Sequence, residues 1–136
     1  MILRRVAAVG TALLATLAGC RRGPEHVADR FVDAYFVQAS QDTALGLSTG
    51  LATRKLKEEL VLVSSVRAEK NVRPDARPTI RAHRRGVEVA RGLAEVRYHL
   101  TVESSNASSV RHALIVLRQA SGQWRVSNWS LSEAVP

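Results

Sequence analysis

Hydrophobic side chains near the start of the chain recur at the three- and four-residue steps of an α-helix. The pattern predicts a helix over about residues 25–38, in which Pro24 suits the first turn and Glu25 and Asp29 suit the positive end. Its stripe consists of Val27, Phe31, Ala34, Tyr35 and Gln38, with Val32 and Phe36 beside them. Asp33 lies off this stripe, so we expect it to face solvent.

Two further helices are expected before residue 70. Asp42 is a candidate N-cap for a short helix to about Thr49, with Gly50 as its C-cap residue. A third helix is predicted from about Thr53 to Ala68. Its inward positions would be Leu56, Leu60 and Val63, and its solvent-facing positions would be Lys55, Lys57, Glu58 and Glu59. Residues 71–78 contain two prolines and are predicted to form a loop.

From Thr79 onward the hydrophobic period changes to two, which indicates β-strands. The first strand is expected over residues 80–90, with a possible irregularity at Gly86 and a turn at Arg91-Gly92. Residues 93–103 alternate cleanly, as in an antiparallel strand with one buried face. The expected inward positions are Ala94, Val96, Tyr98, Leu100 and Val102, and the polar positions are Glu95, Arg97, His99, Thr101 and Glu103.

Two more strands complete the pattern. Residues 110–118 are mostly apolar on both faces, which favours a central strand. A turn at Ser121-Gly122 leads into the last strand, over residues 123–131. In that strand Trp124 and Val126 share one parity, whereas Trp129 and Leu131 share the other. A bulge near Asn128 would bring all four side chains to the same face.

Helices followed by about four strands with short turns predict an α+β fold, with the helices packed on one face of a curved antiparallel sheet. The length of 136 residues suits one domain, which we place at residues 25–136. Apolar residues make up 46% of the chain, and this fraction excludes a wholly disordered protein.

The first 19 residues have the organisation of a signal peptide. Arg4 and Arg5 form a short positive region, and Val6–Leu17 follows without a charge. A membrane-spanning helix needs about 20 apolar residues, and this run is shorter. We therefore predict that residues 1–19 are a cleaved signal peptide rather than an anchor.

The sequence Leu17-Ala18-Gly19-Cys20 resembles the bacterial lipobox. The resemblance implies a diacylglycerol on the Cys20 sulfur, cleavage before Cys20, and acylation of the new N-terminus with a chain such as palmitate. Residues 20–24 would then be a lipidated tether. A protein anchored in this way sits in the cell membrane or outer membrane and faces the periplasm or exterior; Arg21 in place of Asp favours the outer membrane. The alternative is a plain secretory signal with an incidental cysteine.

Two segments carry a second resemblance. Residues 28–35 (ADRFVDAY) and residues 122–129 (GQWRVSNW), together with the order of the elements, resemble the nuclear transport factor 2-like superfamily. This superfamily includes ketosteroid isomerases and polyketide cyclases. The resemblance implies a cone that encloses an apolar pocket between sheet and helices, in which enzymatic members place an Asp or His as a base.

The formal net charge of the chain is +8, and it becomes +6 once Arg4 and Arg5 are removed. Residues 73–97 are the most basic stretch, with seven Arg and no aromatic residue. Aromatic residues interleaved with the charge would help nucleic-acid binding, and an exported, lipid-anchored protein meets little nucleic acid, so we expect no nucleic-acid partner. Attraction to anionic lipid headgroups or acidic cell-wall polymers is one alternative for this stretch. A solvated loop and strand face is the interpretation that we favour.

The residues expected to line a pocket are Tyr35, Tyr98, His112 and Trp124. His112 shares parity with Val110 and Leu114 and could point inward. The two tyrosines are expected in the core, with a hydroxyl that reaches a polar partner. No residue matches a catalytic motif, so no catalytic residue is assigned. The chain has one cysteine, and its histidines lack the local spacing of a metal site, so no metal or cofactor is expected.

These observations favour a non-enzymatic lipoprotein of the cell envelope. Its partners would be the lipid bilayer through acylated Cys20, and a protein partner, a second copy of the chain or a small apolar ligand through the folded domain. A small-molecule enzyme of the ketosteroid isomerase or polyketide cyclase type is the alternative. A structural subunit without a ligand is the third possibility.

Overall fold

A computed structural model describes residues 23–69 and 77–133. The predicted signal peptide, Cys20, and most of the predicted loop at 71–78 lie outside these described residues. The helical elements are α1 (Pro24–Val32), the π-helical segment η1 (Asp33–Val37), α2 (Gln41–Leu45) and α3 (Gly50–Glu69). The strands are β1 (Thr79–Ala90), β2 (Leu93–Glu103), β3 (Ser108–Ala120) and β4 (Gln123–Glu133).

The predicted first helix is confirmed, but it changes its winding after Val32. Backbone hydrogen bonds from Gln38 to Asp33 (2.9 Å) and from Ser40 to Ala34 (2.7 Å) widen the last turn into η1. Ala39 then takes a positive φ of 52°, and the chain reverses into α2. The α1 stripe still faces inward: Ala28, Phe31 and Val32 are buried, whereas Asp33 is exposed as predicted.

The predicted limits of the short second helix and the predicted start of the third were wrong, whereas the predicted end of the third near Ala68 agrees with the observed end at Glu69. Ser40, not Asp42, holds the N-cap position of α2, and α2 ends at Leu45 with Gly46 as its C-cap residue. Gly50 does not cap this helix; it begins α3 with a φ of +56°, a conformation that glycine adopts without strain. The intervening segment pairs with β4, because Thr49 donates to the Val126 carbonyl and Val126 donates to the Leu47 carbonyl.

The described strands form one antiparallel sheet in the order β1-β2-β3-β4, which confirms β3 as a central strand. Arg91-Gly92 and Ser121-Gly122 make tight turns with positive φ at both residues of each pair. The register shifts at Gly86 in β1, as predicted. A second shift, between Val116 and Leu117, leaves an extra residue in β4. Trp124, Val126, Trp129 and Leu131 therefore share one face, and the predicted bulge near Asn128 is confirmed.

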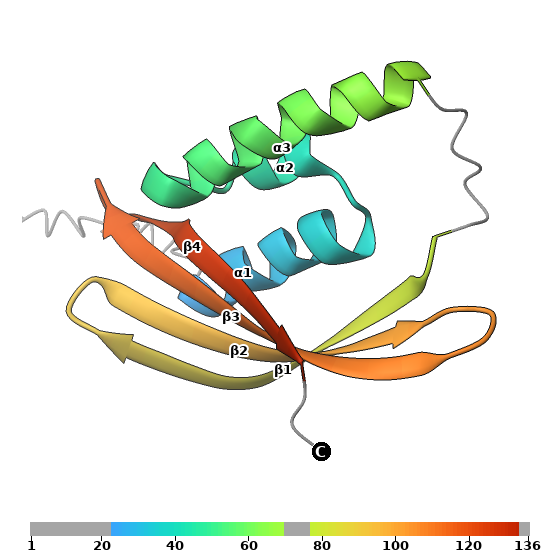
Figure 1. Ribbon diagram of the computed structural model, residues 1–136. Helices are drawn as coiled ribbons and strands as arrows, with labels where there is room; N and C mark the ends of the chain where they lie inside the picture. The colour runs from blue at the N-terminus through green and yellow to red at the C-terminus, as the bar shows by residue number, and fades with distance from the viewer. Residues whose placement is uncertain (1–22, 70–76, 134–136) are drawn as a thin grey trace, which may run out of the picture.

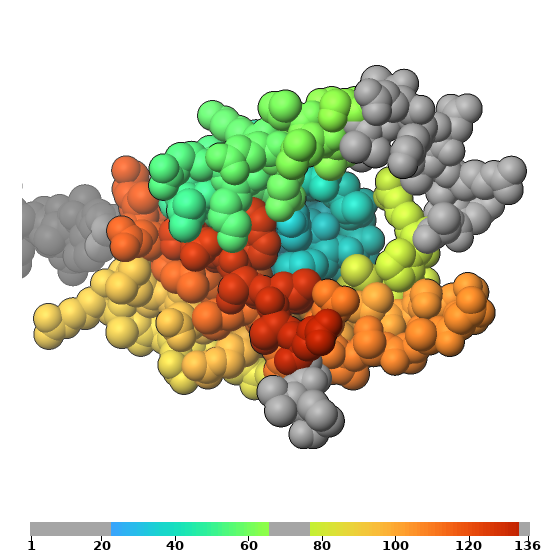
Figure 2. Space-filling model, viewed as in Figure 1, coloured from blue at the N-terminus to red at the C-terminus, as the bar shows by residue number. Residues whose placement is uncertain are grey.

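The helices cover one face of this twisted sheet (Figure 1), which confirms the α+β architecture with helices on one side. We call the covered side the inner face and the opposite side the outer face. In the space-filling view α3 lies across the top, and part of the helical layer, in cyan, shows between α3 and the sheet (Figure 2). Core side chains from the helices and the inner face pack together; the largest fully buried ones are Phe31, Leu56, Leu100, Ile115 and Leu117. No helix in the described part of the chain is long and apolar enough to cross a bilayer.

Candidate functional site

A hollow opens on the helical side of the molecule, between the first helix and the edge of the sheet. It has a volume of about 440 Å³, and we call it the α1–β1 hollow. Its apolar wall consists of Val32, Val37, Ile80 and Ala82, and its polar wall consists of Asp29, Asp33, Arg81, Arg84 and Tyr98. The size is within the usual range for small-ligand pockets, and the lining is apolar on one side and polar on the other.

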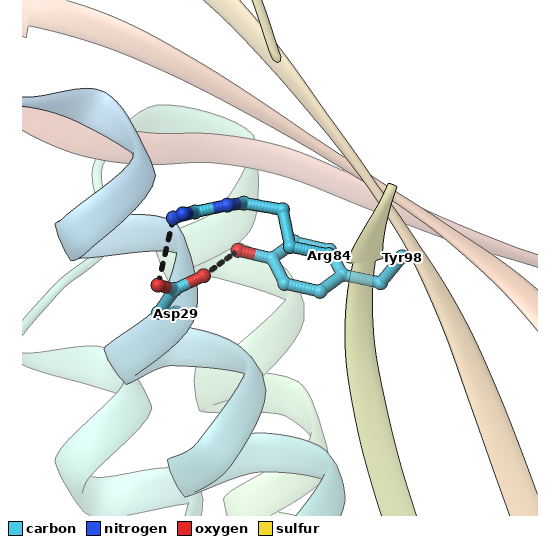
Figure 3. Close-up of polar contacts among 3 residues, drawn as sticks. All are labelled: Asp29, Arg84 and Tyr98. Atoms are coloured by element: carbon cyan, nitrogen blue, oxygen red, sulfur yellow. Dashed lines mark hydrogen bonds and ion pairs between the residues drawn. The ribbon is translucent and has the colours of Figure 1, made fainter. Parts of the chain in front are cut away.

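Three polar side chains meet in this hollow (Figure 3). Arg84 and Tyr98 stand at directly opposite positions on β1 and β2, and both reach toward Asp29 on α1. The Tyr98 hydroxyl donates a hydrogen bond to Asp29 Oδ1 at 2.6 Å, and Arg84 forms an ion pair with Asp29 Oδ2 at 2.8 Å. Each carboxylate oxygen of Asp29 therefore has its own donor.

The Tyr98 ring is buried, although its hydroxyl reaches the hollow. Burial, followed by the hydrogen bond to Asp29 and the negative charge of that carboxylate, raises the pKa of Tyr98 above its ordinary value. The hydroxyl therefore stays neutral at physiological pH and keeps its proton on the bond to Asp29. This arrangement orients Asp29 and joins α1 to the sheet.

A second tyrosine on the inner side is paired in the same way. The Tyr35 hydroxyl lies 2.7 and 2.9 Å from the two carboxylate oxygens of Glu59, a contact that joins η1 to α3. Burial, with the hydrogen bond and charge of Glu59, raises the pKa of Tyr35. The expectation that each tyrosine hydroxyl would reach a partner is confirmed.

Two of the charged residues expected to face solvent on α3 are instead half-buried. Glu59 accepts from Tyr35, and Lys55 Nζ lies 4.1 Å from the centre of the Trp129 ring and donates to the Trp129 carbonyl at 2.9 Å. Their aliphatic stems cover the core while their charged ends find partners at its edge. The prediction holds for Lys57 and Glu58, which are exposed.

The four residues expected to line a pocket lie in different places. Tyr98 lines the α1–β1 hollow, and Tyr35 stacks on Phe31 with ring centres 5.7 Å apart. Trp124 packs partly buried against the core. The inward direction considered for His112 was wrong: it is exposed on the outer face. The reason is that β3 buries the other parity, namely Ala113, Ile115 and Leu117.

Sequence reasoning did not single out Asp29 or Arg84 as site residues. One signal for Arg84 was present, because it shares parity on β1 with Ile80 and Ala82, which face inward. A charged residue at an inward strand position needs a partner, and here the partner is on α1. For Asp29, the sequence showed only an acidic residue near the start of a helix.

The chain matches no protein-family model and no curated protein. Within the residues that the structure describes, no group of three or more His, Cys, Asp or Glu side chains is placed to hold a metal ion. The α1–β1 hollow and its paired polar groups therefore define the candidate site on geometry alone.

Proposed function

We propose that this chain is a membrane-anchored lipoprotein of the cell envelope, with a nuclear transport factor 2-like domain that binds a small ligand rather than transforming it. In this proposal Cys20 carries the lipid, and the α1–β1 hollow receives the ligand. The anchor rests on the sequence, and the binding role rests on the hollow.

The position of the fold relative to Cys20 is compatible with an anchor. The helix α1 begins at Pro24, four residues after Cys20. A lipid at Cys20 would hold the domain close to the bilayer surface. Two or more acyl chains on one residue are enough for stable attachment, because each buried methylene contributes about 0.8 kcal/mol.

The pairing of the polar groups in the hollow is the observation that favours binding over catalysis. A general base needs a lone pair that can reach the substrate proton. Asp29 is held by Tyr98 and Arg84, and Asp33 accepts a hydrogen bond from the Gln38 side chain at 2.6 Å. These carboxylates are engaged within the protein, so they suit orientation of a ligand better than proton abstraction.

The lining of the hollow also indicates the chemistry of the ligand. An apolar body would lie against Val32, Val37 and Ile80, where it would replace water. A polar end would meet the Asp29 and Arg84 pair at the other wall. We therefore expect a small molecule with one apolar side and one hydrogen-bonding end.

Anchoring is tested by labelling cells with a radioactive fatty acid. The native chain should incorporate label, and Cys20→Ser should incorporate none and accumulate as the uncleaved precursor. Equal labelling of the two chains would contradict the anchor.

Binding is tested by filling the hollow, with anilinonaphthalene sulfonate as the probe. This molecule has a large apolar part and one polar end, and it fluoresces when it leaves water. Ala82→Phe should reduce the saturable fluorescence at least about tenfold by occupying the apolar wall. Ala120→Phe is the matched control, because Ala120 is exposed at the end of β3 and should leave the signal unchanged. Equal fluorescence from the native chain and both variants would contradict a ligand site in the α1–β1 hollow.

A further inference from the structure

Three histidines form a row across the outer face of the sheet. His83 on β1 lies directly opposite His99 on β2, and His99 lies directly opposite His112 on β3. The rings of His99 and His112 meet edge to face, with their centres 4.4 Å apart. The row is on the side of the sheet that the helices leave uncovered, so it faces solvent.

An arginine is bonded to the middle of this row. The Nε atom of Arg85 donates to Nδ1 of His99 at 3.1 Å. This bond requires Nδ1 to lack a proton, so His99 is neutral while the bond exists. Among the described residues Arg85 has no carboxylate within ion-pair distance, and its two terminal nitrogens remain available as donors. Arg97, in contrast, forms an ion pair with Glu88 at 3.1 Å.

Arg85, Arg97, His99 and His112 line a hollow of about 490 Å³ on the outer face, which we call the histidine hollow. Ser130 and Ser132 on β4 belong to the same lining, together with Tyr98, Ala113 and Leu114. Two arginines, two histidines and two serines therefore border one open hollow. The one acidic residue among its lining residues is Glu133.

We propose that the histidine hollow binds a phosphate group, which Arg85, His99 and His112 hold together. A guanidinium offers a phosphate two parallel hydrogen bonds, and protonated imidazoles add charge-assisted bonds beside it. Tyr98 borders both hollows, but Arg85, His99 and His112 belong to the histidine hollow alone, so variants at these three positions test it separately from the α1–β1 hollow.

The same geometry makes phosphate binding stronger in acid. Protonation of His99 places a hydrogen on Nδ1, so His99 can no longer accept from Arg85. The two groups then become donors that face each other, and an anion between them restores both bonds. Binding and protonation therefore favour each other, and affinity rises as the pH falls through the histidine range.

The pH at which His99 becomes protonated depends on charged neighbours from all the strands around it. They are Arg85 and His83 on β1, Arg97 on β2, His112 on β3 and Glu133 on β4. Partial burial, followed by the positive charges of Arg85, His112 and His83, lowers the pKa of His99. A bound phosphate would offset these positive charges and raise that pKa.

Titration of the full chain with inorganic phosphate tests the proposal. With ¹³C-labelled histidine, the ring resonances of His99 and His112 should shift on phosphate addition. Inorganic phosphate also takes up a proton between pH 7.5 and pH 5.5, so the pH effect is measured against His99→Gln, which experiences the same change in the ligand. Relative to this variant, the native chain should gain about tenfold in affinity over the interval, since histidine charges in this range. If the ring resonances of both histidines keep their chemical shifts when phosphate is added at either pH, the proposal is overturned.

Variants separate the site from general attraction to a basic protein. Arg85→Gln should weaken phosphate binding by about tenfold, because it removes the two terminal donors. His99→Gln should abolish the gain in affinity at low pH, because protonation of His99 Nδ1 is what couples binding to pH. The control is Arg54→Gln, an exposed position on α3 that should leave the affinity unchanged. Equal loss in Arg54→Gln and Arg85→Gln would overturn the proposal, since it would mean that only net charge matters.

Glu133→Gln should change phosphate affinity in the opposite direction to Arg85→Gln. Glu133 places a negative charge beside the phosphate, so its removal should strengthen binding about threefold. Weaker binding in Glu133→Gln would contradict the placement of the anion in this hollow.

Two probes distinguish the source of the phosphate. Glycerol 3-phosphate supplies a soluble monoester, and vesicles of phosphatidylcholine with phosphatidylglycerol supply a lipid headgroup. The source is identified by the probe that shifts the His99 resonance in the native chain but not in Arg85→Gln. Absence of the shift with both probes would overturn the proposal.

Discussion

The two faces of the sheet place their polar side chains under different conditions. On the inner face polar groups are paired across the helix–sheet boundary, as Tyr98 is with Asp29 and Lys55 is with Trp129. On the outer face the pairs lie between neighbouring strands, as Arg97 is with Glu88, and both partners are more than half exposed. The histidine row is on this second face.

We therefore expect inner-face contacts to contribute to the stability of the fold and outer-face contacts to contribute little. On the inner face the Tyr98 side of the pair is buried, whereas the Asp29 and Arg84 side chains are 46% and 40% exposed, so breaking the Tyr98–Asp29 bond leaves the tyrosine hydroxyl with poor alternatives. An outer-face pair can exchange its partner for water or an anion at little cost. Substitutions at comparable positions on the two faces should therefore have unequal effects on stability.

The largest difference should come from adjacent residues on the central strand β3. Ile115 is fully buried on the inner face, whereas its neighbour Val116 is half-buried on the outer face. Ile115→Ala should lower the free energy of unfolding by about 3 kcal/mol, through lost burial and a residual cavity. Val116→Ala should cost about 1 kcal/mol or less. Urea melts of both variants measure this contrast, and equal losses would remove the distinction between the faces.

A smaller loss is expected when the Tyr98 hydroxyl is removed. Tyr98→Phe keeps the buried ring and deletes the donor to Asp29, which retains its ion pair with Arg84. Because the bond is charge-assisted and the ring is buried, the free energy of unfolding should fall by about 1.5 kcal/mol near neutral pH. Denaturant melts of the two chains give this value, and an unchanged midpoint would mean that the bond contributes nothing.

The difference in stability between the native chain and Tyr98→Phe should also depend on pH. The pKa of Tyr98 is raised in the folded state, so the unfolded chain loses this proton first, near pH 10. Stability from the Tyr98 hydroxyl is therefore complete below about pH 10 and declines above it by about 1.4 kcal/mol per pH unit. Native and Tyr98→Phe chains should converge in stability as the pH rises from 10 to 11. A constant difference over that interval would contradict a raised pKa.

The smallest effect should come from an ion pair on the outer face. Glu88→Gln removes the 3.1 Å contact with Arg97, whose side chain is 54% exposed. Exposed pairs of this kind contribute little, so the stability change should stay below about 0.5 kcal/mol. A loss as large as that of Tyr98→Phe would mean that the outer face is covered in the folded protein.

Periodicity predicted the sheet more accurately than the helices. The limits of β2 and the shift at Gly86 were predicted, because alternation ties each residue to a face. The π-helical winding of η1 and the start of α3 at Gly50 were not. These features depend on how the helices pack against β4 and on backbone angles that a hydrophobic pattern does not record.

The candidate site was only partly predictable, for a related reason. Tyr98 was expected to find a polar partner, but the partner lies 69 residues away on α1 and no local spacing identifies it. The histidine row depends on strand register, which sets residues 16 and 13 positions apart directly opposite each other. For His112, parity alone left two faces open, and the burial of Ile115 and its neighbours decides between them.

Chemical modification of the folded full chain tests the division between the two faces most directly. Diethyl pyrocarbonate modifies accessible neutral histidines, and tetranitromethane nitrates accessible tyrosines. At pH 7 we predict modification of His99 and His112 together with an unreacted Tyr98, as mapped by peptide mass spectrometry. Nitrated Tyr98 alongside protected His99 and His112 would contradict this division, because it would place the covered side of the sheet opposite to the one described.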